Sequence, residues 1–289
     1  MNQVTRKAYA KINLGLDVLK RRPDGYHEVK MVMQSISLCD ELMFAENASI
    51  GAPSITIRCD SAAVPAGEGN IVYRAAASIY ERYRLKNPVT VTLKKRIPVA
   101  AGMAGGSTDA AAVFHGLNTL FDLGMTAAEM CEMATKIGAD VPFCLVGGTA
   151  LSEGIGEKLT PLPAAAPCCV LLAKPDISVS TKWVYENFCL NGLAGHPDID
   201  GMVTAIKNRD LSGILNRMEN VLETVTIGEY PLINEIKQKM LSHGAEKALM
   251  SGSGPTVFGI FADEEKAQAA YGKMKSEYEA YITSFRRSQ

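Results

Sequence analysis

The stretch PVAAGMAGGSTDAAA, from Pro98 to Ala112, joins a run of small residues with three glycines to an alanine-rich helical pattern. Small side chains let the backbone approach a ligand closely. A helix beginning at Ser107 would point its free N–H groups and the positive end of its dipole back at the loop. This combination is a good anion site, and phosphate is its usual ligand. A glycine-rich turn with an ordinary serine cap is the alternative, because glycine motifs alone often mislead.

The best-known phosphate loops are absent from the chain. It contains neither the G-x-x-x-x-G-K-[ST] loop nor the G-x-G-x-x-G fingerprint of dinucleotide-binding folds. The H-R-D signature of protein kinases is missing as well. Phosphate chemistry in this protein must therefore use another scaffold.

Upstream of the loop, apolar and polar residues alternate from Ala8 to Val18. A period of two predicts a half-buried strand. It also places Lys11 and Asn13 on one face of that strand, about 6.6 Å apart along its length. The ordinary interpretation of such a lysine is a solvated surface group. The sequence Arg22-Pro23-Asp24-Gly25 then predicts a turn.

The remaining elements mix strands and helices without a steady βαβα alternation, which favours an α+β fold. We expect strands near residues 29–44, 55–57, 89–94, 168–173, 248–250, 256–261 and 281–285. We expect helices over 70–83, after Thr126, over 181–188, 211–222 and 232–241, and after Asp263. The Pro/Ala stretch from Pro161 to Pro167 predicts a linker, and we place the domains at residues 1–160 and 161–289.

Length and composition set the broad class. A chain of 289 residues corresponds to about two domains. With 30 basic and 31 acidic residues there is no gross basic field, which argues against a dedicated nucleic-acid binder. No apolar stretch reaches the ~18 residues of a membrane helix, so no membrane partner is expected. The cysteines number 7, with no C-x-x-C pair, which disfavours a zinc ribbon and predicts a reducing, cytoplasmic setting.

Two further segments carry candidate residues. Ser251-Gly252-Ser253-Gly254 lies between two predicted strands, and a simple hairpin is its ordinary interpretation. Asp140 lies among small and apolar residues just past a predicted helix end. It is either a surface aspartate or a partly buried one, and a buried carboxylate needs a partner such as a lysine.

Three segments, in this order, resemble the GHMP kinase superfamily: Lys11 to Leu14, Pro98 to Ala112, and Ser251 to Gly254. The resemblance spans residues 7–261, most of the chain. The Asp24-Gly25-Tyr26-His27 element is similar to one branch of that family, whose acceptor is the cytidine diphosphate derivative of methylerythritol. The family implies a ribosomal-protein-S5-like N-terminal domain and a ferredoxin-like C-terminal domain, with ATP and substrate between them. It implies a small-molecule kinase that phosphorylates the 2-hydroxyl of that acceptor, in the non-mevalonate route to isoprenoid precursors.

The resemblance also implies roles for individual residues. Asp140 would accept the hydroxyl proton, Lys11 would hold Asp140, and Asn13 would orient both. Tyr26 and His27 would recognise cytosine, with Tyr185 as a second stacking ring and Thr181 as a polar contact. ATP would be bound with Mg²⁺, for which the sequence assigns no protein ligand. The residues expected to bind the nucleotide are Pro98, Val99, Ala100, Ala101, Gly102, Met103, Ala104, Gly105, Gly106, Ser107 and Thr108.

The loop departs from the commoner family pattern. Ala100, Ala101 and Ala104 stand where glycine is usual, and Met103 stands where leucine is usual. Alanine tolerates positive φ poorly, so a stiffer or slightly shifted loop is expected. Two other functions stay open: another kinase of the superfamily, acting on mevalonate or homoserine, and a non-catalytic nucleotide sensor or RNA-binding protein. The presence of both Lys11 and Asp140 argues against the second, and the oligomeric state stays open.

Overall fold

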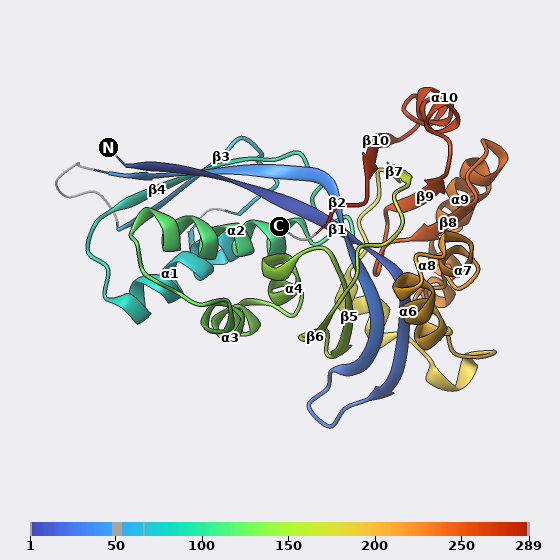
Figure 1. The fold of residues 1–289 in the computed structure, drawn as a ribbon, viewed down its shortest axis with the longest axis horizontal. Coiled ribbons are helices and arrows are strands. Elements are labelled where there is room, and N and C mark those ends of the chain that lie inside the picture. Colours follow the sequence, from blue (N-terminus) through green and yellow to red (C-terminus); the bar gives the residue numbers. More distant parts are fainter. Residues whose placement is uncertain (1, 48–53, 66, 288–289) are drawn as a thin grey trace. The chain divides into compact units, whose positions relative to one another are not determined.

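A computed structural model describes residues 2–47, 54–65 and 67–287 (Figure 1). The chain divides into two compact units, each assembled from separate segments. The first unit comprises Met1–Ala10, Cys39–Val99 and Ala104–Val146, and the second comprises Lys11–Leu38, Ala100–Met103 and Gly147–Gln289. The domain boundary expected between residues 160 and 161 stays a prediction. Within the described ranges, no helix is both long and apolar enough to cross a membrane.

The sheet of the first unit is built on the end of a long strand. The strands β1 (Gln3–Arg21) and β2 (His27–Glu46) each contribute residues to both units. In the first unit, residues 41–46 of β2 pair antiparallel with β4 (Val89–Lys94), which pairs in parallel with β3 (Ile55–Cys59). The alternation of Val89, Val91 and Leu93 turns these three apolar side chains into the core, as their spacing predicts.

Helices cover this sheet and bury its apolar face. They are η1 (Gly67–Gly69), α1 (Ile71–Tyr83), α2 (Gly105–Leu120), α3 (Ala127–Ile137) and α4 (Val141–Val146). Two predicted helix starts are confirmed: Asn70 caps α1, and Thr126 forms a capping box with Glu129 at α3. Figure 1 shows α1 and α2 running side by side along the sheet. A Cβ on Gly116 of α2 would meet the ring of Phe44 at 2.3 Å, so this helix packs very closely on β2.

In the second unit, residues 29–34 of β2 pair with β5 (Thr149–Gly154), and β5 pairs with β6 (Lys158–Leu162). The predicted linker Pro161–Pro167 is therefore wrong at its start, because Pro161 and Leu162 belong to β6. This strand ends the path of the sheet, and an edge strand tolerates proline although proline has no backbone N–H to donate.

A second sheet completes this unit. Its strands β7 (Cys169–Lys174), β8 (Lys247–Met250), β9 (Val257–Phe261) and β10 (Glu279–Ser284) lie in the antiparallel order β10-β7-β9-β8. The last helices are α9 (Leu232–Ser242), before β8, and α10 (Glu264–Met274), between β9 and β10. This succession is the ferredoxin-like βαββαβ arrangement. With the first unit it confirms the α+β class.

The helices between β7 and α9 differ from the predicted pattern. They are α5 (Thr181–Glu186), η2 (Leu190–Gly192), α6 (Ile199–Lys207), α7 (Leu211–Leu215) and α8 (Glu223–Glu229). The single helix predicted over 211–222 is wrong, because α7 ends at Leu215. The Asn220 amide instead donates to the carbonyls of Met250 and Gly252, at 2.9 and 2.8 Å, and its oxygen accepts from the Leu222 N–H.

The close packing of α2 gives a stability test. Gly116→Ala should destabilise the protein by about 1–3 kcal/mol, because the new methyl group overlaps the Phe44 ring. Gly272→Ala in α10 is the matched control: nothing lies within 4 Å of its Cβ position. Because alanine favours a helix interior over glycine, this change should stabilise by about 0.5–1 kcal/mol. Thermal unfolding followed by circular dichroism measures both, and equal melting temperatures for the two variants would contradict the packing.

Candidate functional site

The glycine-rich loop has an unusual backbone. Ala100, Gly102 and Ala104 have φ angles of 53°, 73° and 57°, in the left-handed region. Both alanines therefore adopt the conformation that glycine favours, at a cost of roughly 1 kcal/mol each. Val99 is 41% exposed on the loop, whereas Pro98 before it is buried.

The helix after this loop starts earlier than the sequence suggests. α2 begins at Gly105 with Ala104 as its N-cap, so the prediction that Ser107 opens the helix is wrong. The left-handed turn at Ala104 brings the chain into the helix, and an alanine offers no capping oxygen. The amides of Gly105, Gly106 and Ser107 lie in the first turn, where a helix provides them no internal acceptor. Such an N-terminus suits a phosphate group.

Thr108 in the same turn is committed to the fold. Its hydroxyl donates to the Tyr9 carbonyl at 2.7 Å, and its side chain is buried. The helix start is thereby tied to β1 of the same unit. Among the expected nucleotide residues, Thr108 has its hydroxyl engaged by the protein itself.

Lys11 and Asn13 meet on the predicted face of β1, in the second unit. The Lys11 ammonium donates to Asn13 Oδ1 at 2.8 Å, and both side chains are buried. The Lys11 backbone N–H donates to the carbonyl of Met103, in the middle of the glycine-rich loop, at 3.2 Å. A buried ammonium group is costly unless oxygen atoms accept hydrogen bonds from it, and Asn13 Oδ1 is one such acceptor.

The Ser251–Gly254 turn lies against the same stretch of loop. Ser251 Oγ donates to the Gly102 carbonyl at 3.0 Å. A Cβ on Gly102 would be 2.2 Å from the Ser251 carbonyl oxygen, so only glycine fits there. A Cβ on Gly252 would in turn lie 3.5 Å from Asn13 Oδ1. The structure thus brings together, within one unit, three segments that the sequence singled out separately.

The turn before His27 is held by its own side chains. Asp24 accepts from the Arg22 guanidinium and, at 3.1 Å, from the Tyr26 N–H. The hydrogen bond from Arg22 lowers the pKa of the Asp24 carboxyl below its usual value. Gly25 supplies the positive φ of 88°. This rigid turn presents Tyr26, which is 61% exposed.

His27 lies in an aromatic group in the same unit. Its ring stacks on Tyr185, with centroids 5.3 Å apart and an angle of 29° between the planes. Phe188, which sequence reasoning missed, meets His27 edge-on at 6.5 Å. Burial, followed by the nearby charge of Arg21, lowers the pKa of His27, so its imidazole is neutral at pH 7. Thr181 Oγ1 lies 2.8 Å from Ser253 Oγ of the glycine turn.

Asp140 belongs to the first unit, at the junction of two helices. α3 ends at Ile137 with Gly138 as its C-cap, and the Val141 N–H donates to the Gly138 carbonyl at 3.1 Å. The Asp140 carbonyl accepts from the Cys144 N–H at 3.1 Å as α4 begins. The side chain is half-buried, which agrees with the partly buried alternative for this residue.

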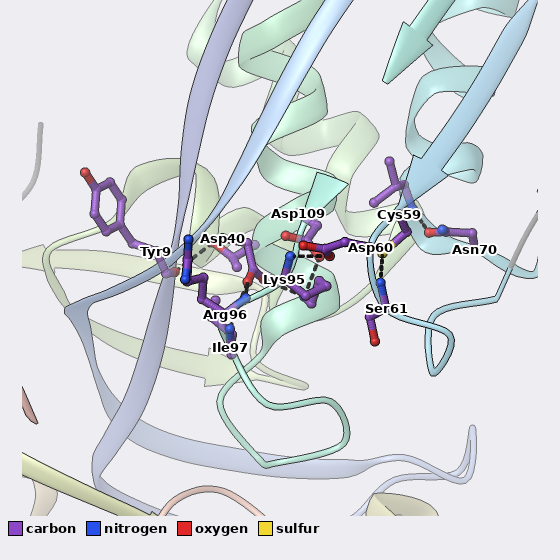
Figure 2. A network of polar contacts seen from close by, with 12 residues as sticks. Tyr9, Asp40, Cys59, Asp60, Ser61, Asn70, Lys95, Arg96, Ile97 and Asp109 are labelled. Carbon is purple, nitrogen blue, oxygen red and sulfur yellow. Dashed lines mark hydrogen bonds and ion pairs between the residues drawn. The ribbon is translucent and has the colours of Figure 1, made fainter. Parts of the chain in front are cut away.

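A buried ion-pair network in the first unit was missed by sequence reasoning (Figure 2). Lys95 lies between Asp40 and Asp109, and all three side chains are at least nine-tenths buried. Two carboxylates share one ammonium, and neither the spacing nor any motif in the sequence links these positions. Across the residues described, no group of three or more His, Cys, Asp or Glu side chains is arranged to hold a metal ion.

Two family models match the chain. "GHMP kinases N terminal domain" covers residues 70–148 and "GHMP kinases C terminal" covers residues 202–280. A protein from Acetivibrio thermocellus, named 4-diphosphocytidyl-2-C-methyl-D-erythritol kinase, is 50% identical over 98% of this chain and 99% of its own length. A protein of the same name from Enterococcus faecalis is 46% identical over 94% of this chain and 95% of its own.

Solved structures give the same picture of the fold. The crystal structure of a 4-(cytidine 5'-diphospho)-2C-methyl-D-erythritol kinase superposes with a TM-score of 0.83 at 31% identity, covering 98% of this chain and 99% of that one. A homoserine kinase from Cytophaga hutchinsonii has a TM-score of 0.78 at 19% identity, covering 100% of this chain and 96% of that one. At that identity the second likeness concerns the fold alone.

The left-handed alanines give a test within the loop. Ala104→Gly should stabilise the protein by about 0.5–1 kcal/mol, because glycine relieves the strained φ. Ala101→Gly is the matched change at a buried position without positive φ, and it should destabilise by a similar amount. Urea denaturation measures both free energies of unfolding. A loss of stability in Ala104→Gly would show that the loop backbone is not strained there.

Proposed function

Because the chain belongs to the GHMP kinase family, we propose that it transfers the γ-phosphoryl group of ATP to the 2-hydroxyl of 4-diphosphocytidyl-2-C-methyl-D-erythritol. The reaction would supply the non-mevalonate route to isoprenoid precursors. The observation that carries the choice of substrate is the aromatic pair of His27 and Tyr185. This pair occurs in a chain that is 50% identical in sequence, over nearly its full length, to relatives named for that substrate.

Phosphoryl transfer needs positioning and charge neutralisation more than covalent chemistry. We assign Asp140 as the base that accepts the proton of the attacking hydroxyl. Lys11 supplies a fixed positive charge for the negative charge that develops during transfer. Asn13 keeps that ammonium in place through its side-chain oxygen, which lies 2.8 Å away. Since both groups are buried on one strand, they need little reorganisation when the reaction occurs.

The nucleotide phosphates are assigned to the glycine-rich loop and the first turn of α2. Gly105, Gly106 and Ser107 offer backbone N–H groups there, together with the positive end of the helix dipole. Mg²⁺ would enter as part of the MgATP substrate. In this role the ion neutralises charge on the phosphates.

The cytosine end of the acceptor is assigned to the aromatic group. Tyr26 and Tyr185 offer ring faces for stacking, and the neutral imidazole of His27 offers one donor and one acceptor to a base edge. Thr181 adds a hydroxyl beside Ser253. We place the enzyme in the cytoplasm, where ATP is available and where its seven free cysteines stay reduced.

Replacing the proposed base should abolish turnover without unfolding the protein. Asp140→Asn removes proton acceptance at nearly constant shape, so kcat should fall by about 10²–10⁴. Asp122→Asn, the same change at an exposed residue of the same unit, should leave kcat unaltered. ADP release in a coupled assay measures both variants. Retention of more than a tenth of wild-type kcat in Asp140→Asn would rule out Asp140 as the base.

The aromatic group should set the choice of acceptor. Loss of one stacked ring in Tyr185→Leu should raise KM for the cytidine substrate about 5- to 150-fold while KM for ATP stays constant. Tyr230→Leu is the control, because it removes a ring of the same unit that packs edge-on against Trp183 and not a ring assigned to the cytosine.

The same assay decides between members of the family. Wild-type enzyme offered mevalonate, homoserine and the cytidine compound should release ADP only with the last. Turnover of mevalonate or homoserine would favour another kinase of the family. ATP binding without turnover of any of these alcohols would favour a non-catalytic sensor.

A further inference from the structure

The chain enters the glycine-rich loop through three residues whose backbone amides are all held by aspartates (Figure 2). The N–H of Lys95 donates to Asp60 Oδ1 at 2.9 Å. The N–H groups of Arg96 and Ile97 both donate to Asp40 Oδ1, the latter at 2.8 Å. Three consecutive amides fixed in this way leave the incoming segment little freedom to rotate.

The chain leaves the loop through the first turn of α2, and the same lysine reaches that turn. The Lys95 ammonium donates to Asp40 Oδ2 and, at 2.8 Å, to Asp109 Oδ2. A Cβ on Gly105 would lie 3.1 Å from Ile97 Cγ2 and 3.5 Å from Lys95 Nζ, so the two segments are in direct contact. All these residues belong to the first unit.

We propose that Asp40, Asp60, Lys95 and Asp109 form a clamp that fixes both ends of the glycine-rich loop, and that they are positioning residues for the nucleotide phosphates. The proposal rests on the assignment of those phosphates to this loop. A loop rich in glycine loses much conformational freedom when it closes on a ligand. Clamped ends would reduce that loss before the nucleotide arrives, which is how preorganisation raises affinity.

The members of the clamp differ in how fully they are bonded. Both oxygens of Asp40 have donors: Lys95 on one, and two backbone N–H groups on the other. Asp109 uses only Oδ2, since its buried Oδ1 has no hydrogen-bond partner among the described residues. Burial, opposed by Lys95 and reinforced by Asp40, raises the pKa of Asp109 well above its usual value. Asp40 is therefore the anchor, and Asp109 is the link to α2 that substitution can remove.

The experiment compares variants at the two ends of the clamp. Asp109→Ala removes the link to α2 and should raise KM for ATP about tenfold, as expected for loss of one hydrogen bond to a charged group, with kcat changed less than about threefold. Asp109→Asn keeps an acceptor oxygen for Lys95 and should restore KM to within about threefold of wild type. KM for the acceptor should stay constant in both.

A second variant guards against misfolding. Asp60 is exposed, so Asp60→Ala should fold normally while it frees the N–H of Lys95, and KM for ATP should rise about threefold. Glu132→Ala removes a comparably exposed carboxylate from the same unit and should change neither KM. The dissociation constant of a non-hydrolysable ATP analogue, measured by calorimetry, should follow KM for ATP in each variant.

The outcomes separate this proposal from the function it rests on. If the wild type fails to phosphorylate the cytidine substrate, the proposed function falls, while the calorimetry still tests the clamp. ATP-analogue affinities within twofold of wild type for both Asp109→Ala and Asp60→Ala would overturn the clamp. So would equal rises in KM for ATP and for the acceptor, or a fall in kcat alone with a lowered melting temperature, because these would show general damage to the fold.

Discussion

A buried ammonium group has to be surrounded by oxygen atoms, and Lys95 meets this requirement by drawing Asp40 and Asp109 to itself. The cost of removing three charges from water is recovered only if the geometry is good and the remaining lone pairs are satisfied. Asp40 achieves this by accepting two backbone N–H groups where β4 gives way to the loop. One ion-pair network therefore fixes the end of β4, the start of the glycine-rich loop and the first turn of α2.

The second unit contains a buried lysine of a different kind. The Lys11 ammonium donates to the amide oxygen of Asn13 at 2.8 Å, and this acceptor carries no formal charge. The contrast separates two uses of a buried cation. Lys95 is bonded to two carboxylates and serves the architecture of the loop, whereas for Lys11 we propose a role beside the negative charge that develops during phosphoryl transfer.

Features that depend on neighbouring residues could be predicted from the sequence. The period-two alternation of β1 places Lys11 and Asn13 on one face, and the caps at Asn70 and Thr126 need only residues two or three positions away. The glycine segments around Gly102 and Gly252 could be named as candidates. Their contact in the second unit is a tertiary interaction, which no local sequence pattern predicts.

Other features were missed or mistaken because distant partners decide them. Ser107 is an ordinary capping residue by type, yet the left-handed conformation of Ala104 starts the helix two residues earlier. The helix predicted over 211–222 is interrupted because Asn220 bonds to carbonyls of the turn near Gly252. Lys95 and Asp109 are unremarkable charged residues in the sequence, and only the folded chain shows that they meet. The roles of Asp140, Tyr26 and His27 stay predictions drawn from the family.

The division of the chain into units has a consequence for its synthesis on the ribosome. Every segment of the first unit lies before Gly147, whereas the second unit needs both the middle of β1 and strand β10, which ends at Ser284. Since domains generally fold as they are made, starting from the N-terminus, the first unit has all its residues before residues 147–289 are translated. During that interval residues 11–38 lack β5, the strand with which β2 pairs in the folded protein. The nascent chain therefore carries an apolar hairpin of β1 and β2 whose β2 edge has no partner, and such edges are prone to aggregation.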